Sequence, residues 1–262
     1  MSGRERLVKV ASGLLRGMPV GEPPPTPHSF GVETGTGVLT DLLVEVGKTF
    51  GTPCTFEDKV NSNLVHDVYY VPSDHDTQLG SGASKLEWHV EDGCFENRAD
   101  WLFLLCLRGV DSVTTSTAHI EDLRLPVRDV VLLMNRRVRL KLDDSFMGAG
   151  QTIASVPTLD WRDGRFEIVF DPAYSDASDA DLIAALDRLS SEASRVRTDV
   201  VLGTGDLLVL DNRRVMHARS AYDLSTSARD RWLKRMLVMS EVEAVDWAEP
   251  GVVRGRVFQD AN

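Results

Sequence analysis

Cysteine is scarce in this chain of 262 residues, and Cys54, Cys94 and Cys106 show no paired spacing. An odd number of cysteines without a CxxC motif argues against a disulfide framework and against a cysteine zinc site. No apolar run approaches the roughly 18 residues of a membrane helix, and the N-terminus lacks the apolar segment of a secretory signal. We therefore expect reduced thiols, a cytoplasmic location and no membrane partner.

Positive charge is lacking as well, because 29 Lys and Arg face 40 Asp and Glu, giving a net charge of -11. A surface for nucleic acid or anionic lipid needs clustered cations, so we expect neither partner. The loops GxGxxG and GxxxxGK[ST] are also missing, which argues against common nucleotide-binding sites. An anionic small molecule held by one or two buried arginines remains compatible with this composition.

The composition, with 42% hydrophobic and 26% charged residues, is that of an ordinary globular protein. The length suits one domain, and we predict a single domain over residues 1–262. Within it we expect an N-terminal helix and a Pro-rich connector over 1–35. A core with helical insertions follows over 36–240, and a C-terminal extension covers 241–262. The stretch "GEPPPTPHSFG" predicts the extended connector.

Two segments have helical spacing: residues 37–53, where Gly51-Thr-Pro stops the helix, and residues 178–196, where Ser178 or Asp179 is placed to cap it. From about residue 63 onward most segments are short, rich in β-formers and bounded by Gly, Asp, Asn or Pro. This pattern predicts a mainly β protein with flanking helices and a jelly-roll (double-stranded β-helix) core, with an α+β sandwich as the alternative. The predicted strands are 63–72, 85–91, 101–109, 129–135, 137–142, 165–171, 206–212, 214–220 and 232–242.

The segment "LEWHVEDG" places His89 and Glu91 two residues apart, so in a strand both side chains project from the same face. Such a pair is either a surface ion pair or two ligands of one metal. A further strand, "RVMHARS", carries His217. Two histidines and one carboxylate on one side of a metal leave positions open, as in the facial triad of non-heme Fe(II) oxygenases.

The segment "ARDRWLKRMLV" places Arg231 and Arg235 on one strand face, about 13 Å apart. A buried arginine is costly unless it meets an anion, and a guanidinium binds a carboxylate through two parallel hydrogen bonds. The strand therefore predicts two carboxylate sites.

Together these motifs resemble the clavaminate synthase-like branch of the Fe(II)/2-oxoglutarate-dependent oxygenases, within the taurine dioxygenase superfamily. The branch carries His-x-Glu where most relatives have His-x-Asp, followed by a strand like "DNRRVMHARS". An arginine stands fourteen residues after the distal histidine and a second one four residues further on, as here. The resemblance covers about residues 36–240 and includes "NLVHDVYYVP", "DWLFLLCLRG", "TTSTAHIEDL" and "DDSFMGAG".

The resemblance implies a role for each matching residue. Arg231 binds the distal carboxylate of 2-oxoglutarate, supported by Thr115, with Thr117 as the alternative. Arg235 binds a substrate carboxylate. No catalytic residue is implied beyond the metal site, whose Fe(II) ligands are His89, Glu91 and His217.

Two further positions concern the substrate. His66 stands where relatives usually have a Gln that contacts the substrate amino group. Asp171 lies in the region where arginine hydroxylases of this branch bind the guanidinium with acidic residues, so a basic substrate side chain is favoured over an acidic one.

The implied function is hydroxylation of an unactivated carbon in a free amino acid or small derivative, with Fe(II), 2-oxoglutarate and dioxygen, in natural-product (antibiotic) biosynthesis. Desaturation or ring closure on the same fold is one alternative. A non-catalytic jelly-roll binding protein is another, against which the intact ligand set argues. A radical halogenase is disfavoured because Glu91 occupies the position where halogenases carry a small residue.

Overall fold

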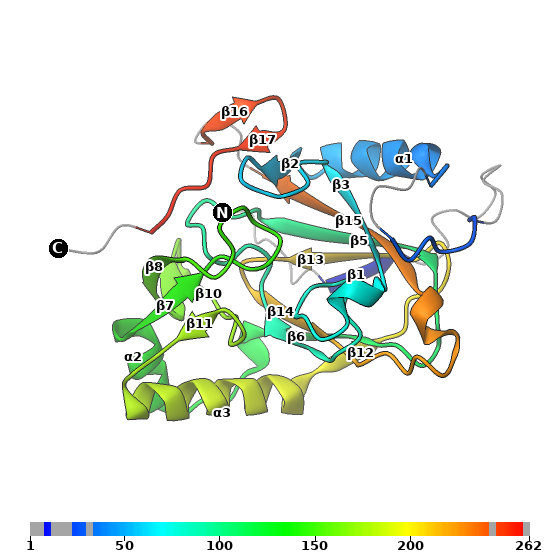
Figure 1. The fold of residues 1–262 in the computed structure, drawn as a ribbon. Helices are drawn as coiled ribbons and strands as arrows, with labels where there is room; N and C mark the ends of the chain where they lie inside the picture. The colour runs from blue at the N-terminus through cyan, green and yellow to red at the C-terminus, as the bar shows by residue number, and fades with distance from the viewer. Residues whose placement is uncertain (1–7, 12–22, 30–33, 241–244, 259–262) are drawn as a thin grey trace.

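The computed structural model describes residues 8–11, 23–29, 34–240 and 245–258, and it is mainly β with flanking helices, as predicted (Figure 1). An eight-stranded sheet and a four-stranded sheet lie in successive layers. The larger sheet contains β1 (Val8–Ala11), β13 (Leu207–Asp211), β5 (Trp101–Arg108), β15 (Trp232–Met239), β3 (Val65–Tyr69), β2 (Thr52–Phe56), β17 (Val252–Val253) and β16 (Trp247–Glu249).

The four-stranded sheet is the second layer, and it carries much of the site described below. Its strands are β12 (Thr198–Val200), β6 (Thr115–His119), β14 (Val215–Arg219) and β4 (Leu86–His89). Within the described ranges there are also two small sheets: β11 (Ser175–Asp176) with β7 (Arg137–Lys141) and β8 (Thr152–Pro157), and the hairpin β9 (Leu159–Arg162) with β10 (Arg165–Ile168).

Helices cover the outer faces of the two layers. Helix α1 (Gly37–Lys48) packs on β15 and β2, while α3 (Ala180–Val196) packs on β6 and on α2 (Val127–Asn135). Asp179 caps α3, as one of the two predicted residues, by accepting a hydrogen bond from the Leu182 amide at 3.0 Å. The described residues also form three short 3-10 helices: η1 (Pro72–Asp74), η2 (Ile120–Asp122) and η3 (Ser227–Asp230).

Strand β15 divides the core by its alternating side chains. Leu233 and Leu237 belong to the buried cluster between the two sheets. They alternate with the same period as Arg235, so they lie on the strand face predicted for it. Trp232 and Met236 point the other way and pack in the cluster that includes Leu39 of α1. This alternation turns one face of β15 toward the interior between the sheets, where the site is found.

The prediction of a strand over 129–135 is wrong, because these residues form α2. The buried residues Asp129 and Leu133 lie four apart, whereas Val127 and Val131 on the opposite side are 80% and 52% exposed. A continuous apolar run fits a strand or a helix equally well. Here the run forms a helix, and Asp129 of this helix forms an ion pair with Arg188 of α3.

The predicted N-terminal helix falls largely outside the described residues. Its described part, Val8–Ala11, is strand β1, which pairs antiparallel with β13, so helix is wrong there. The connector residues 23–29 contain no helix or strand, and Arg108 holds them by donating to the carbonyls of Pro23 and Pro24 at 3.0 Å.

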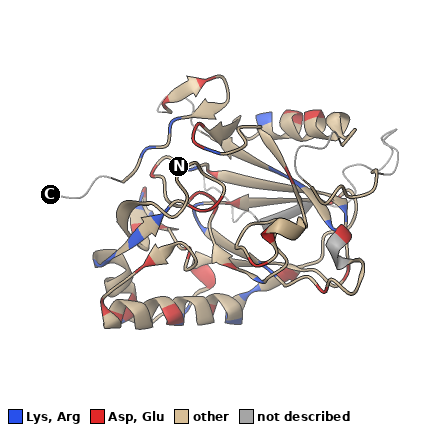
Figure 2. Ribbon diagram, in the orientation of Figure 1, with Lys and Arg blue, Asp and Glu red and all other residues tan. Residues whose placement is uncertain are grey.

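The remaining general expectations concern cysteine, membrane and charge. All three cysteines are free and buried. No helix among the described residues has the length and apolar character needed to span a bilayer. Basic and acidic residues are interspersed over the ribbon in the view of Figure 2.

Candidate metal centre and active site

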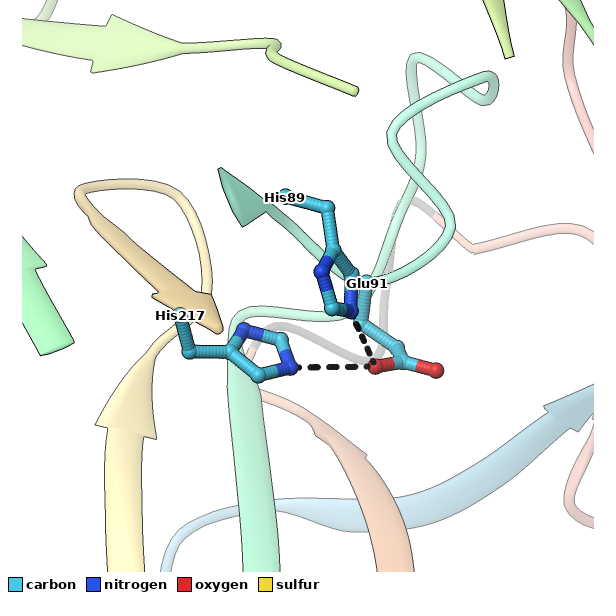
Figure 3. A group of neighbouring side chains, drawn as sticks. All are labelled: His89, Glu91 and His217. Atoms are coloured by element: carbon cyan, nitrogen blue, oxygen red, sulfur yellow. Dashed lines mark ion pairs between the residues drawn. The ribbon is translucent and has the colours of Figure 1, made fainter. Parts of the chain in front are cut away.

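The three predicted metal ligands lie together (Figure 3). His89 ends β4 and sits opposite His217 of β14 in the strand register, with ring centroids 4.1 Å apart. Glu91 follows in the turn after β4, and its Oε2 lies 3.9 Å from Nε2 of His89 and 3.6 Å from Nε2 of His217. One ligand atom from each residue therefore falls within a group no wider than 4.8 Å.

The chemistry of these atoms fits a divalent metal. Nδ1 of His89 donates to the carbonyl of Glu87 at 2.8 Å, so Nε2 is left unprotonated in the neutral ring and faces the other ligands. Burial and the neighbouring His217 lower the pKa of His89. Burial opposes ionisation of Glu91, but Arg235 and the two histidines outweigh it and hold its pKa well below the usual value. All these directions favour the deprotonated forms that bind metal.

The ligands line a cavity of about 620 Å³, a size that suits a small substrate and a cosubstrate together. The same cavity is lined by every residue predicted for cosubstrate or substrate binding, namely Thr115, Arg231, Arg235, His66 and Asp171. The structure thus brings the predicted residues together, although they are spread over more than 160 positions of the sequence, from His66 to Arg235.

Arg231 immediately precedes β15 and is only 3% exposed. Its Nη2 donates to Oγ1 of Thr115, the first residue of β6, at 2.9 Å. Thr117 lies opposite His217 in the sheet, and its hydroxyl donates to the Thr198 carbonyl at 3.4 Å instead. Of the two predicted threonines, Thr115 is the one that contacts Arg231.

Arg235 and His66 face each other across the β15–β3 ladder. Nη1 of Arg235 forms an ion pair with Oε1 of Glu91, and its Nε has no hydrogen-bond partner among the described residues. Burial opposes the charged form of Arg235, yet Glu91 raises the pKa of this guanidinium above its usual value. Burial, followed by Arg235 and Lys59, lowers the pKa of His66 to about 3, so its ring is neutral near pH 7.

Asp171 lies after β10, half-buried, and accepts hydrogen bonds from the amides of Ala173 and Tyr174 at 3.1 and 3.3 Å. Burial, and to a smaller extent Asp143, raises the pKa of Asp171 to about 6. Asp143 and Asp144 also line the cavity, and neither was predicted as a site residue. The only sequence signal for them was the pair of adjacent acids in "DDSFMGAG".

Residues 155–237, which include β14 and most of β15, match the family described as "Taurine catabolism dioxygenase TauD, TfdA family". The L-asparagine oxygenase of Streptomyces coelicolor is 29% identical over 259 residues, covering 95% of this chain and 77% of that protein. Over this segment the chain is similar to the TauD/TfdA dioxygenases. It is in addition 26% identical over 225 residues to the enduracididine beta-hydroxylase of Streptomyces hygroscopicus, and the match covers 75% of this chain.

Solved structures of amino-acid oxygenases are also similar to this chain. Asparagine oxygenase in complex with Fe(II), 2S,3S-3-hydroxyasparagine and succinate superposes with a TM-score of 0.79 and 25% identity, covering 91% of this chain and 76% of that one. OrfP in complex with Fe, succinate and (3S)-hydroxy-L-Arg gives a TM-score of 0.77 at 25% identity, over 89% and 78% of the two chains. The match spans 66% of the length of the enduracididine hydroxylase, just under two thirds.

Proposed function

We propose that this protein is an oxygenase that hydroxylates an unactivated carbon of a free amino acid or small amino-acid derivative, in natural-product biosynthesis, with Fe(II), 2-oxoglutarate and dioxygen. The observation that carries the proposal is the convergence of a His, Glu, His ligand set and two arginines on one cavity of about 620 Å³. We also propose that the two main sheets are the halves of a jelly-roll core, since they share one buried cluster.

His89, Glu91 and His217 are the residues that would hold Fe(II). Bound there with 2-oxoglutarate and dioxygen, the metal supplies the oxidising power that breaks a strong C–H bond. The protein contributes position and the exclusion of water, and it needs no further acid or base. The exclusion of water is consistent with the burial of the ligands, since His217 and Glu91 are each 6% exposed.

Arg231 would neutralise the distal carboxylate of 2-oxoglutarate. It is buried, lines the cavity and has no carboxylate partner in an ion pair among the described residues. Its one side-chain hydrogen bond given by the structure goes to the neutral hydroxyl of Thr115, which orients the guanidinium without cancelling its charge. A desolvated guanidinium of this kind is stabilised strongly by an incoming anion.

Arg235 would bind the substrate α-carboxylate. Its present partner is Glu91, the carboxylate that the metal would share, and no residue in the described part of the chain bonds to its Nε. A second carboxylate would complete the hydrogen bonding of the fork. The neutral ring of His66, opposite Arg235, would accept a hydrogen bond from the substrate ammonium group.

Asp171 and Asp143 would receive a basic substrate side chain. Both line the cavity, and the charge of Asp143 contributes to the raised pKa of Asp171. Two carboxylates facing a common space favour a cation between them. Relatives with such substrates include an L-lysine 3-hydroxylase and an L-ornithine/L-arginine 3-hydroxylase of Catenulispora acidiphila, each 26% identical to this chain.

A succinate-release screen tests the proposal. The protein is incubated with Fe(II), 2-oxoglutarate, ascorbate and single amino acids, with lysine, ornithine and arginine set against asparagine, and the products are identified by mass spectrometry. We expect substrate-dependent succinate and a product heavier by one oxygen, preferentially from the basic amino acids. In Asp171→Asn that preference should weaken, whereas Asp163→Asn in the β9–β10 turn should retain it. Activity that survives removal of iron by a chelator would overturn the oxygenase assignment.

A further inference from the structure

Glu91 is the one candidate ligand that the strand ladder does not hold. His89 and His217 are partners in the β4–β14 register, but β4 ends at His89. The next amide, that of Val90, already bonds to the Phe170 carbonyl at 3.1 Å, and Asp92 has a left-handed φ of 51°. Glu91 therefore stands on a turn, where the backbone needs another source of hydrogen bonds to be fixed.

Asn212 supplies those bonds from its side chain. Its Oδ1 accepts from the Glu91 amide at 2.8 Å, and its Nδ2 donates to the Glu91 carbonyl at 2.9 Å. Nδ2 also donates to the Ala99 carbonyl at 3.1 Å, which ties the far end of the same loop. One amide side chain thus takes the place of a neighbouring strand, bonding to both backbone groups of the ligand residue.

The environment of Asn212 makes this contact rigid. The residue is 1% exposed, and its own amide donates to the Asp100 carbonyl at 2.8 Å. It stands in the turn between β13 and β14, five residues before His217. The same hairpin therefore carries one ligand directly and holds the backbone of another.

We propose that Asn212 is a positioning residue for the metal centre, acting through the backbone of Glu91. This inference rests on the proposed function, because it concerns the same metal. The chemistry requires an asparagine: one acceptor and two donors at the end of a short side chain. Aspartate has no donor for the two carbonyls when ionised. Residues that orient metal ligands typically contribute about 10- to 100-fold to metal affinity.

Co(II) binding to the full-length protein tests the inference, with the affinity taken from a titration of the visible absorption and the fold from circular dichroism. In Asn212→Ala we expect about 10- to 100-fold weaker Co(II) binding and an altered spectrum of the bound ion. The matched control is Asn97→Ala. Asn97 is also a buried amide in the Glu91–Ala99 loop, but it bonds to Arg254 and Arg256 of the C-terminal segment. It should lose stability yet keep the wild-type Co(II) spectrum and affinity.

The outcomes separate the two proposals. Wild-type affinity and spectrum in a folded Asn212→Ala would overturn the positioning role and leave the oxygenase assignment intact. Equal loss of Co(II) affinity in both asparagine variants would also overturn it, because the effect would then be general to the loop. Absence of Co(II) and Fe(II) binding by the wild type would overturn the metal centre itself, and the positioning role with it. Should Asn212→Ala not fold, Asn212→Ser decides by the same criteria, because a serine hydroxyl has one donor hydrogen and cannot make all three bonds of the amide.

Discussion

Arg231 and Arg235 stand four residues apart, at the start and in the middle of the same strand segment, and both line the active-site cavity. Arg231 is 3% exposed, and its guanidinium donates to the hydroxyl of Thr115. Arg235 instead forms an ion pair with Glu91, the carboxylate among the candidate metal ligands. One arginine therefore has a neutral partner, while the other has a charged one.

This difference suggests how one cavity can direct the carboxylates of 2-oxoglutarate and of the substrate to different arginines. The charge at Arg231 is available to an incoming carboxylate whether or not a metal is present. The charge of Arg235 is partly neutralised by its ion pair with Glu91. A second carboxylate would therefore bind Arg235 more strongly if Glu91 gave electron density to a bound metal. We infer that 2-oxoglutarate binding depends mainly on Arg231, and that substrate binding at Arg235 is coupled to the occupancy of the metal centre.

Replacing Glu91 has the largest expected effect, because it removes a metal ligand and the partner of Arg235 together. In Glu91→Ala we expect turnover below detection by succinate release. The weak visible absorption that Fe(II) and 2-oxoglutarate give together under anaerobic conditions should be lost as well. The control Glu96→Ala removes a carboxylate of the same loop that pairs with Arg256 outside the cavity lining, and it should retain both signals. Normal turnover in Glu91→Ala would refute the ligand role.

Replacing Arg231 by lysine should weaken 2-oxoglutarate binding at least about tenfold. Loss of one charge-assisted pair in a desolvated site costs about 2–5 kcal/mol, and lysine lacks the planar fork. Anaerobic titration of the iron-loaded protein measures the affinity. Arg235→Lys is the matched variant and should leave 2-oxoglutarate affinity unchanged. The reverse result, with a loss only in Arg235→Lys, would exchange the roles of the two arginines.

Replacing Arg235 by alanine should remove discrimination between a substrate amino acid and its carboxamide. A buried guanidinium left facing a neutral amide is poorly satisfied, so the wild type should prefer the acid strongly. The measurement is kcat/KM for the acid and the amide in both proteins. Equal turnover of the two by the wild type would remove the carboxylate proposal. Undiminished preference in Arg235→Ala would keep that proposal and assign the role to another residue.

The sequence predicted which side chains lie together in the cavity better than it predicted some of the secondary structure, and the reason is physical. A period of two along a strand predicts that His89 and Glu91 project together, and Arg231 and Arg235 likewise, without knowledge of the rest of the fold. All four residues line the cavity, although β4 ends at His89 and Glu91 lies in the turn that follows. The apolar run of residues 130–134 carries no such period, because a buried helix and a buried strand share the same composition. Only packing against α3 distinguishes them, and packing is a property of the folded chain.

Contacts made by residues in turns could not be predicted from the sequence for the same reason. Nothing in the spacing of Asn212 and Glu91 indicates that an amide 121 positions away bonds to the ligand backbone. Asp143 likewise reaches the cavity from the segment after β7, whose position depends on tertiary contacts. The choice between Thr115 and Thr117 was also left open, since both lie on the same face of a strand and differ only in register relative to Arg231.

Thr115 therefore provides the smallest and most selective test of the comparison. In Thr115→Val the hydroxyl that accepts from Arg231 is replaced by a methyl group of similar size, and the guanidinium keeps its charge but loses one orienting bond. A neutral hydrogen bond contributes about 0.5–1.5 kcal/mol, so we expect 2-oxoglutarate affinity to fall by about 2- to 10-fold. Thr117→Val removes the hydroxyl two residues away, which bonds to the Thr198 carbonyl, and it should leave the affinity unchanged. A loss confined to Thr117→Val would mean that Arg231 changes its threonine partner when 2-oxoglutarate binds.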